Sequence, residues 1–191
     1  MTTAQHLVIM GVSGSGKTTI ANLLSKRLGW IAAEADEFHP AANIAKMSAG
    51  TPLDDDDRWP WLYAIRDWMD TQAGNGRCTI VTCSALKRTY RDVLAQAAGD
   101  VHFIHLEGSS EVLAERMKTR SGHFMPPSLL PSQLSTLEPL APDENGRRID
   151  ITDSPADIVD TVLRHLGLAV ARSPAGLSGS NGRTTGETVE K

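Results

Sequence analysis

The chain has 191 residues, 40% of them hydrophobic, a length and composition that suit one globular domain with a substantial core. Its 19 Lys and Arg residues against 23 Asp and Glu residues give a net charge of -4, which argues against nucleic acid as the main partner. The sequence contains no basic leader and no run of about 18 apolar residues. We therefore expect a cytoplasmic protein that is neither secreted nor inserted into a membrane.

The first apolar run, residues 7–10, leads into a glycine-rich turn that has the pattern of a phosphate loop. In such a loop, glycines free backbone N–H groups to wrap a polyphosphate, Lys17 reaches the β- and γ-phosphates, and Thr18 holds Mg²⁺. The helix that follows adds the positive end of its dipole. The pattern predicts a nucleoside triphosphate site that transfers the γ-phosphoryl group. Its expected members are Gly11, Ser13, Gly14, Ser15, Gly16, Lys17, Thr18 and Thr19.

Apolar runs then alternate with amphipathic ones, as in βαβ units. This pattern predicts a three-layer α/β fold of the phosphate-loop NTPase class, with a five-stranded, mostly parallel sheet. Strands are expected over residues 7–10, 30–34, 79–83, 101–106 and 148–151. Helices are expected over residues 19–28, after Trp59, over 111–120 and behind the N-cap Ser154. We expect a kinase domain over residues 1–170 and a polar, disordered tail over 171–191.

Carboxylates follow the second expected strand, where ligands of open α/β sheets bind. Asp36 is the best-placed catalytic base for an alcohol substrate, and it is also a candidate to help Thr18 hold Mg²⁺. The alternative is an acidic loop that caps the next helix. His39 precedes Pro40 in an extended turn, and we interpret it as a substrate-positioning residue rather than a metal ligand.

Two groups of cations stand at helix starts, where they oppose the helix dipole. Arg58 follows an acidic run, just before the start of the helix expected after Trp59. Its charge opposes the helix dipole there unless it pairs with an aspartate or with a ligand anion. Lys87 and Arg91 follow the third strand and are expected to share a helix face at i, i+4. We interpret them as an anion pocket for a substrate carboxylate or phosphate, with a basic solvent face as the alternative.

The helix expected over residues 111–120 carries Arg116 and Arg120 on one face and runs into a loop rich in Gly and Pro. This arrangement is typical of a mobile lid, here over residues 120–136. Arginines delivered by a lid can neutralise the charge on a transferring phosphoryl group, so Arg116 and Arg120 are predicted to bind nucleotide and Arg120 to act in catalysis. The alternative is that they pair with Glu111 or Glu115.

Six blocks of the sequence form a pattern that is more specific than the phosphate loop alone. They are residues 11–18, 36–40, 43–53, 57–62, 83–92 and 122–125. Two of them, Cys-Ser-Ala-Leu-Lys at Cys83 and Gly-His-Phe-Met at Gly122, are not shared by generic nucleotide kinases. Together the six blocks resemble the bacterial gluconokinases. One departure is Glu34-Ala35-Asp36, where the family usually reads Asp-Gly-Asp.

The resemblance implies a fold like that of nucleoside monophosphate and shikimate kinases. It also implies the reaction of ATP with D-gluconate to give 6-phosphogluconate, a homodimer, and a substrate site that includes His123. The rival readings are a shikimate kinase-like or nucleoside monophosphate kinase-like enzyme and a GTP-dependent switch. Two observations argue against the switch. The Asp-x-x-Gly match at Asp143 lies too far along the chain, in a polar loop, and the sequence contains no Asn-Lys-x-Asp motif for recognising guanine.

Overall fold

A computed structural model describes residues 3–118 and 127–168. Its sheet has five strands, all paired in parallel in the order β2-β3-β1-β4-β5, as the alternating pattern predicts. Each expected strand is present with boundaries within two residues of those predicted. The strands are β1 (Gln5–Met10), β2 (Ile31–Glu34), β3 (Thr79–Cys83), β4 (Asp100–Glu107) and β5 (Gly146–Asp150).

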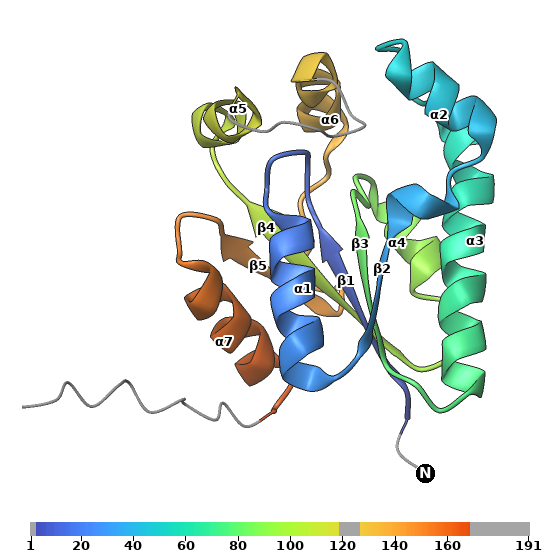
Figure 1. Ribbon diagram of the computed structural model, residues 1–191, viewed down its shortest axis with the longest axis vertical. Helices are drawn as coiled ribbons and strands as arrows, with labels where there is room; N and C mark the ends of the chain where they lie inside the picture. The colour runs from blue at the N-terminus through green and yellow to red at the C-terminus, as the bar shows by residue number, and fades with distance from the viewer. Residues whose placement is uncertain (1–2, 119–126, 169–191) are drawn as a thin grey trace, which may run out of the picture.

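Helices cover both faces of this sheet (Figure 1). One face carries α1 (Lys17–Leu28) and α7 (Pro155–His165), and the other carries α3 (Asp55–Gly74) and α4 (Arg88–Leu94). The remaining helical segments lie above the carboxyl ends of the strands (Figure 1). They are η1 (Ala35–Phe38), α2 (Ala41–Ser48), α5 (Ser110–Lys118), η2 (Pro127–Leu129) and α6 (Leu130–Thr136). The three-layer prediction is confirmed, and all functional loops leave from one edge.

The central strand β1 carries the phosphate loop and is buried on both faces. Its residues Leu7 to Met10 are all 0% exposed, because β1 lies between β3 and β4 and under helices on either side. Continuous apolar runs of this kind are what a parallel strand covered on both faces requires. The loop at the end of β1 is therefore attached to the buried centre of the sheet.

The helix expected after Trp59 begins earlier than predicted, at Asp55. Asp54 is its N-cap and forms a capping box with Asp57: each side chain accepts a hydrogen bond from the other residue's backbone N–H, both at 2.9 Å. Part of the acidic run is thus a helix start signal. The expectation that Trp61 belongs to the core is confirmed, because it is 2% exposed and its indole N–H donates to the Ala35 carbonyl at 2.6 Å.

One buried histidine makes the fold sensitive to acid. His105 of β4 is 1% exposed, and neither of its ring nitrogens has a hydrogen-bond partner among the residues that the structure describes. Burial lowers the pKa of His105 from 6.5 to about 4. The unfolded chain therefore binds a proton more readily than the folded one between pH 6.5 and pH 4, so this residue's contribution to stability is complete above pH 6.5 and is lost toward pH 4.

We expect His105→Leu to reduce this acid sensitivity, because Leu keeps the site apolar and removes the titrating group. The free energy of unfolding of the wild type should fall more steeply between pH 7 and pH 4.5 than that of the variant, by on the order of 2 kcal/mol. Urea unfolding followed at several pH values measures the difference. Parallel pH curves for the two proteins would contradict the assignment.

Candidate active site

The phosphate loop adopts a backbone that only glycine tolerates at its key positions. Gly11 has φ 136°, and a Cβ there would lie 2.5 Å from the Leu106 carbonyl oxygen of β4. Gly16 has φ 93° and is followed directly by α1, whose first residue is Lys17. The loop therefore ends at a helix N-terminus, where backbone N–H groups and the helix dipole favour an anion.

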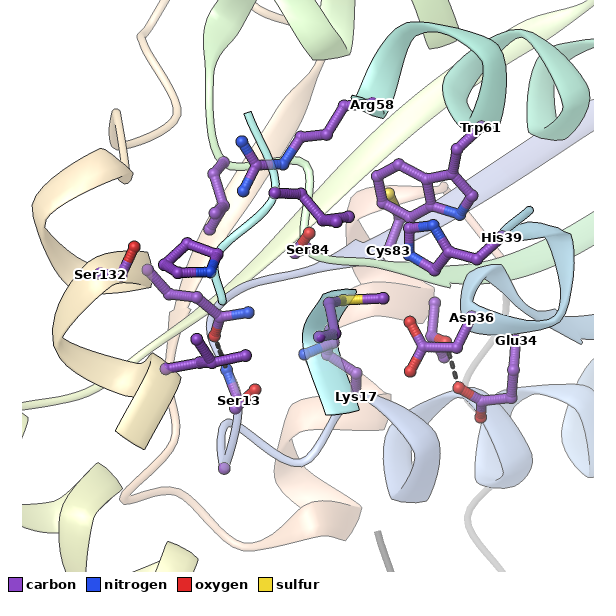
Figure 2. A pocket seen from close by; sticks show the side chains of 18 of the residues that line it. Ser13, Lys17, Glu34, Asp36, His39, Arg58, Trp61, Cys83, Ser84 and Ser132 are labelled. Atoms are coloured by element: carbon purple, nitrogen blue, oxygen red, sulfur yellow. Dashed lines mark hydrogen bonds between the residues drawn. The ribbon is translucent and has the colours of Figure 1, made fainter. Parts of the chain in front are cut away.

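The ammonium group of Lys17 lies over the loop that precedes it. Its Nζ donates to the carbonyl oxygens of Gly11 at 3.0 Å and Val12 at 3.1 Å. Lys17 and Thr18 line a cavity at the carboxyl ends of the strands, together with Ser13, Gly14 and Gly16 (Figure 2). Two other predicted site residues do not line the cavity: Ser15 is buried within the loop, and Thr19 is exposed on α1.

Asp36 lines the same cavity from η1, directly after β2 (Figure 2). The structure therefore brings Asp36 and Lys17 together, as the sequence predicts. Glu34, at the end of β2, also lines the cavity and accepts a hydrogen bond from the Thr82 hydroxyl of β3. Cys83 lines the floor, and burial raises the pKa of its thiol to about 12, so it stays neutral and is no nucleophile.

His39 and Trp61 form one wall of the cavity. Their rings are stacked, with centroids 4.3 Å apart and planes inclined by 13° (Figure 2). Burial, with the nearby Arg58 cation as the second cause, lowers the pKa of His39 to about 4. His39 is thus a neutral imidazole near pH 7, able to orient a hydroxyl but not to pair with an anion as a cation.

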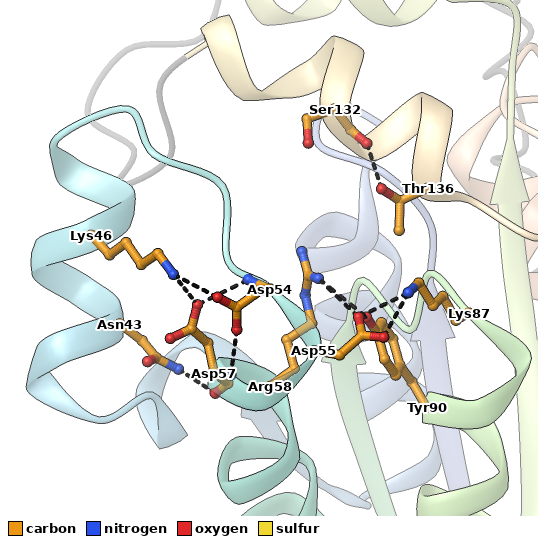
Figure 3. A network of polar contacts seen from close by, with 10 residues as sticks. All are labelled: Asn43, Lys46, Asp54, Asp55, Asp57, Arg58, Lys87, Tyr90, Ser132 and Thr136. Carbon is orange, nitrogen blue, oxygen red and sulfur yellow. Dashed lines mark hydrogen bonds and ion pairs between the residues drawn. The ribbon is translucent and has the colours of Figure 1, made fainter.

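Arg58 reaches the cavity from the first turns of α3. Its guanidinium donates to the Tyr90 hydroxyl at 3.1 Å and lies 3.9 Å from the Asp55 carboxylate (Figure 3). The same carboxylate accepts two hydrogen bonds from Lys87 at 2.8 Å and one from the Tyr90 hydroxyl. One carboxylate therefore serves two cations, and Arg58 is the one of them that lines the cavity.

The predicted anion pocket of Lys87 and Arg91 needs correction. Arg91 is 1% exposed, and its guanidinium pairs with Glu144 at 2.5 and 2.9 Å and donates to the Ala85 carbonyl at 3.0 Å. It is a buried structural cation. Lys87 is the N-cap of α4, with an extended backbone (φ -104°, ψ 152°), so the i, i+4 geometry of a helix face does not apply. Lys87 lines an open groove beside the cavity instead.

Arg116 of α5 lies next to the phosphate loop. A Cβ on Gly16 would lie 3.8 Å from its Nη1, while its Nη2 donates to the Ile151 carbonyl at 2.8 Å. The nucleotide-binding role of Arg116 stays a prediction. Arg120, His123 and residues 120–126 of the expected lid lie outside the described residues, as does the predicted tail.

Gln133 is a cavity residue that sequence reasoning missed. It lies on α6, the last helix of the segment expected to be a lid, and it is 8% exposed. Nothing in the sequence marks it, because α6 has only seven residues and its contact is with a loop 120 positions earlier. Ser132 and Leu129 of the same segment also line the cavity.

The cavity's donor set fits a nucleotide-bound Mg²⁺ rather than a protein-held ion. Within the described residues, no group of three or more His, Cys, Asp or Glu side chains is arranged to hold a metal. A hydroxyl such as Thr18 and one carboxylate such as Asp36, completed by phosphate oxygens and water, are the ligands that Mg²⁺ uses in kinases. Across the described helices, none has the length and apolar character to cross a bilayer.

Comparisons with known proteins identify relatives of this chain. A family model described as an AAA domain matches residues 7–140. The chain is 48% identical over 161 residues to a gluconokinase of Gluconobacter oxydans (strain 621H), which covers 84% of this chain and 90% of the relative. A solved sugar kinase from Janibacter sp. HTCC2649 is 54% identical, with a TM-score of 0.83 over 87% of this chain and 96% of that chain. A solved gluconokinase from Sinorhizobium meliloti 1021 is 45% identical, with a TM-score of 0.77 over 87% and 94%.

Proposed function

We propose that this chain, which belongs to the gluconokinase family, transfers the γ-phosphoryl group of ATP to D-gluconate and forms 6-phosphogluconate. The observation that carries the proposal is the cavity itself. It joins a phosphate loop to a carboxylate, a neutral histidine and an arginine, which are the groups that a polyhydroxy acid acceptor requires. A shikimate or nucleoside monophosphate acceptor and a regulatory GTP switch are not favoured by these relatives.

The donor side of the proposed reaction is the phosphate loop. Backbone N–H groups of the loop and the start of α1 hold the phosphates, and Lys17 and Arg116 offset the charge that develops on the γ-phosphoryl oxygens. Thr18 and Asp36 are the residues that would hold Mg²⁺, which supplies further charge neutralisation when it is bound with the nucleotide. Arg120 stays a predicted catalytic residue.

The acceptor side lies between Asp36, His39 and Arg58. The Asp36 carboxylate accepts the proton of the attacking hydroxyl or orients that hydroxyl, and the neutral His39 ring, fixed by its stack on Trp61, positions a neighbouring hydroxyl. The Asp55 carboxylate lies 2.8 Å from the Lys87 ammonium but 3.9 Å from the Arg58 guanidinium, so it neutralises Lys87 more fully than Arg58. Arg58 is therefore the cation that binds the substrate carboxylate. His123 and Lys87 stay predicted contributors to substrate binding.

We expect Arg58→Ala to raise KM for gluconate by roughly ten- to a hundredfold, the loss of a charge-assisted hydrogen bond of about 1.5 to 3 kcal/mol. KM for ATP should change little. Lys87→Ala should have a smaller effect, since its charge is taken up by Asp55 outside the cavity. Arg66→Ala is the matched control, because Arg66 lies on the same helix and pairs with Asp67. A larger KM change for Lys87→Ala than for Arg58→Ala would move the carboxylate site to the groove.

A coupled assay of ADP formation tests the function as a whole. The purified chain is incubated with MgATP and, in turn, gluconate, glucose, shikimate and nucleoside monophosphates. We expect turnover with gluconate and rejection of glucose, since a neutral acceptor cannot form the ion pair with Arg58 that the gluconate carboxylate forms. Turnover with shikimate or a nucleotide alone would contradict the proposal. The homodimer and the cytoplasmic location expected from the sequence stay predictions, and size-exclusion chromatography tests the first.

A further inference from the structure

A side chain from α6 occupies a backbone donor of the phosphate loop. The N–H of Ser13 donates to Oε1 of Gln133 at 2.7 Å, and the two residues are 7% and 8% exposed (Figure 2 shows this bond as the dashed line at Ser13). This contact joins the phosphate loop to α6, a helix that lines the cavity on the side away from His39 and Asp36 (Figure 2). A short hydrogen bond between buried groups is a contact of defined geometry.

The rest of α6 and its flanks are attached to the acceptor side of the cavity. Leu129, just before α6, forms a small buried cluster with Met47 of α2 and Leu53. After α6, the backbone N–H of Glu138 donates to the Leu86 carbonyl at 2.7 Å, at the loop that follows β3. We call the cavity-lining residues Met47, Leu53, Leu86 and Leu129 the acceptor wall. The segment that contains α6 is attached to this wall at both ends, and the bond from Gln133 to Ser13 links it to the phosphate loop.

We propose that Gln133 is a positioning residue that ties the acceptor wall to the phosphate loop and so directs the γ-phosphoryl group to gluconate rather than to water. The proposal rests on the proposed function. In transfer, the gluconate oxygen bonds to the γ-phosphorus, the bond from that phosphorus to the β,γ-bridging oxygen breaks, ADP leaves with the electron pair, and Asp36 takes the hydroxyl proton. In hydrolysis, water replaces gluconate and inorganic phosphate replaces 6-phosphogluconate.

The position of the acceptor wall relative to the phosphate loop matters because transfer needs the gluconate oxygen within about 3 to 3.5 Å of the γ-phosphorus. Water, in contrast, reaches the γ-phosphoryl group in any arrangement that leaves the cavity open. Loss of the bond also leaves the buried Ser13 N–H without its acceptor, which favours a displaced loop or wall. The effect of Gln133 is therefore on the partition between the two reactions more than on the affinity for either substrate.

Two variants separate this role from a purely structural one. Gln133→Met keeps the length of the side chain but removes both the acceptor and the amide N–H donors. Gln133→Glu also removes the donors but keeps an acceptor for Ser13 and adds a negative charge, so the comparison of the two variants isolates the acceptor. Ser135→Ala is the matched control, since Ser135 is an exposed residue of α6 whose hydroxyl bonds to the Ser132 carbonyl. For each protein, 6-phosphogluconate and ADP are measured with gluconate, and ADP is measured without it.

For Gln133→Met we expect kcat for transfer to fall about tenfold and the ratio of hydrolysis to transfer to rise about tenfold, the size of one buried hydrogen bond. Gln133→Glu should keep the wild-type ratio but raise KM for ATP, because the added charge repels the phosphates. Ser135→Ala should match the wild type. A wild-type ratio in Gln133→Met, with or without a lower melting temperature, would overturn the inference. Absence of 6-phosphogluconate from the wild type would instead overturn the proposed function.

Discussion

Replacement of Lys17 by Ala should abolish nearly all phosphoryl transfer and leave a folded protein. The Lys17 ammonium lies in the phosphate loop at the start of α1, held there by the Gly11 and Val12 carbonyls, and it lines the cavity. Its charge acts where negative charge builds up on the γ-phosphoryl oxygens, and such a preorganised contact is worth several kcal/mol, or about a hundredfold or more in kcat.

Steady-state kinetics with gluconate and MgATP give kcat, and thermal unfolding monitors the fold. Lys26→Ala is the matched control, because Lys26 is an exposed lysine in the last turn of the same helix. We expect the Lys26 variant to behave like the wild type. Retention of more than about a tenth of kcat in Lys17→Ala would contradict the proposal that Lys17 stabilises the transition state, since a charge contact of that kind contributes more than a factor of ten.

Asp36→Asn should produce the second large loss. The amide keeps the shape of the side chain but neither accepts a proton nor binds Mg²⁺ as a carboxylate does, so we expect kcat to fall about a hundredfold or more, in line with the usual contribution of a general base. KM for ATP should change less. Glu37→Gln is the matched control, because Glu37 is the neighbouring exposed carboxylate of η1 and does not line the cavity.

A titration with Mg²⁺ separates the two roles proposed for Asp36. If Asp36 acts as the base, excess Mg²⁺ leaves the kcat of Asp36→Asn low. If it chiefly holds the metal, activity recovers as the Mg²⁺ concentration rises. If Asp36→Asn changes the melting temperature but not kcat, Asp36 belongs to an acidic loop that caps the next helix and has no catalytic role.

Much of the fold and the donor half of the site could be read from local sequence patterns. Parallel strands covered on both faces need continuous apolar runs, and such runs predicted β1, β3 and β4 close to their bounds. The prediction for β5, in which only Ile149 is buried, was also within two residues of its bounds but had no such run behind it. The phosphate loop was readable because its glycines are required by local backbone geometry, as the close approach of Gly11 to Leu106 illustrates. Asp36 and His39 were predictable for a related reason: they follow a strand, and the carboxyl ends of parallel strands meet at one edge.

The tertiary structure alone decided which of three cations lines the cavity. Arg58, Lys87 and Arg91 look alike in sequence, each near a helix start, and the dipole argument treats them equally. Their roles depend on carboxylates supplied from elsewhere: Glu144, 53 residues from Arg91, and Asp55, 32 residues from Lys87. The same holds for Gln133, whose partner Ser13 is 120 residues away. Backbone geometry and apolar periodicity are encoded by neighbours in the chain, whereas the partner of a long polar side chain is set by which distant segments the folded sheet brings together.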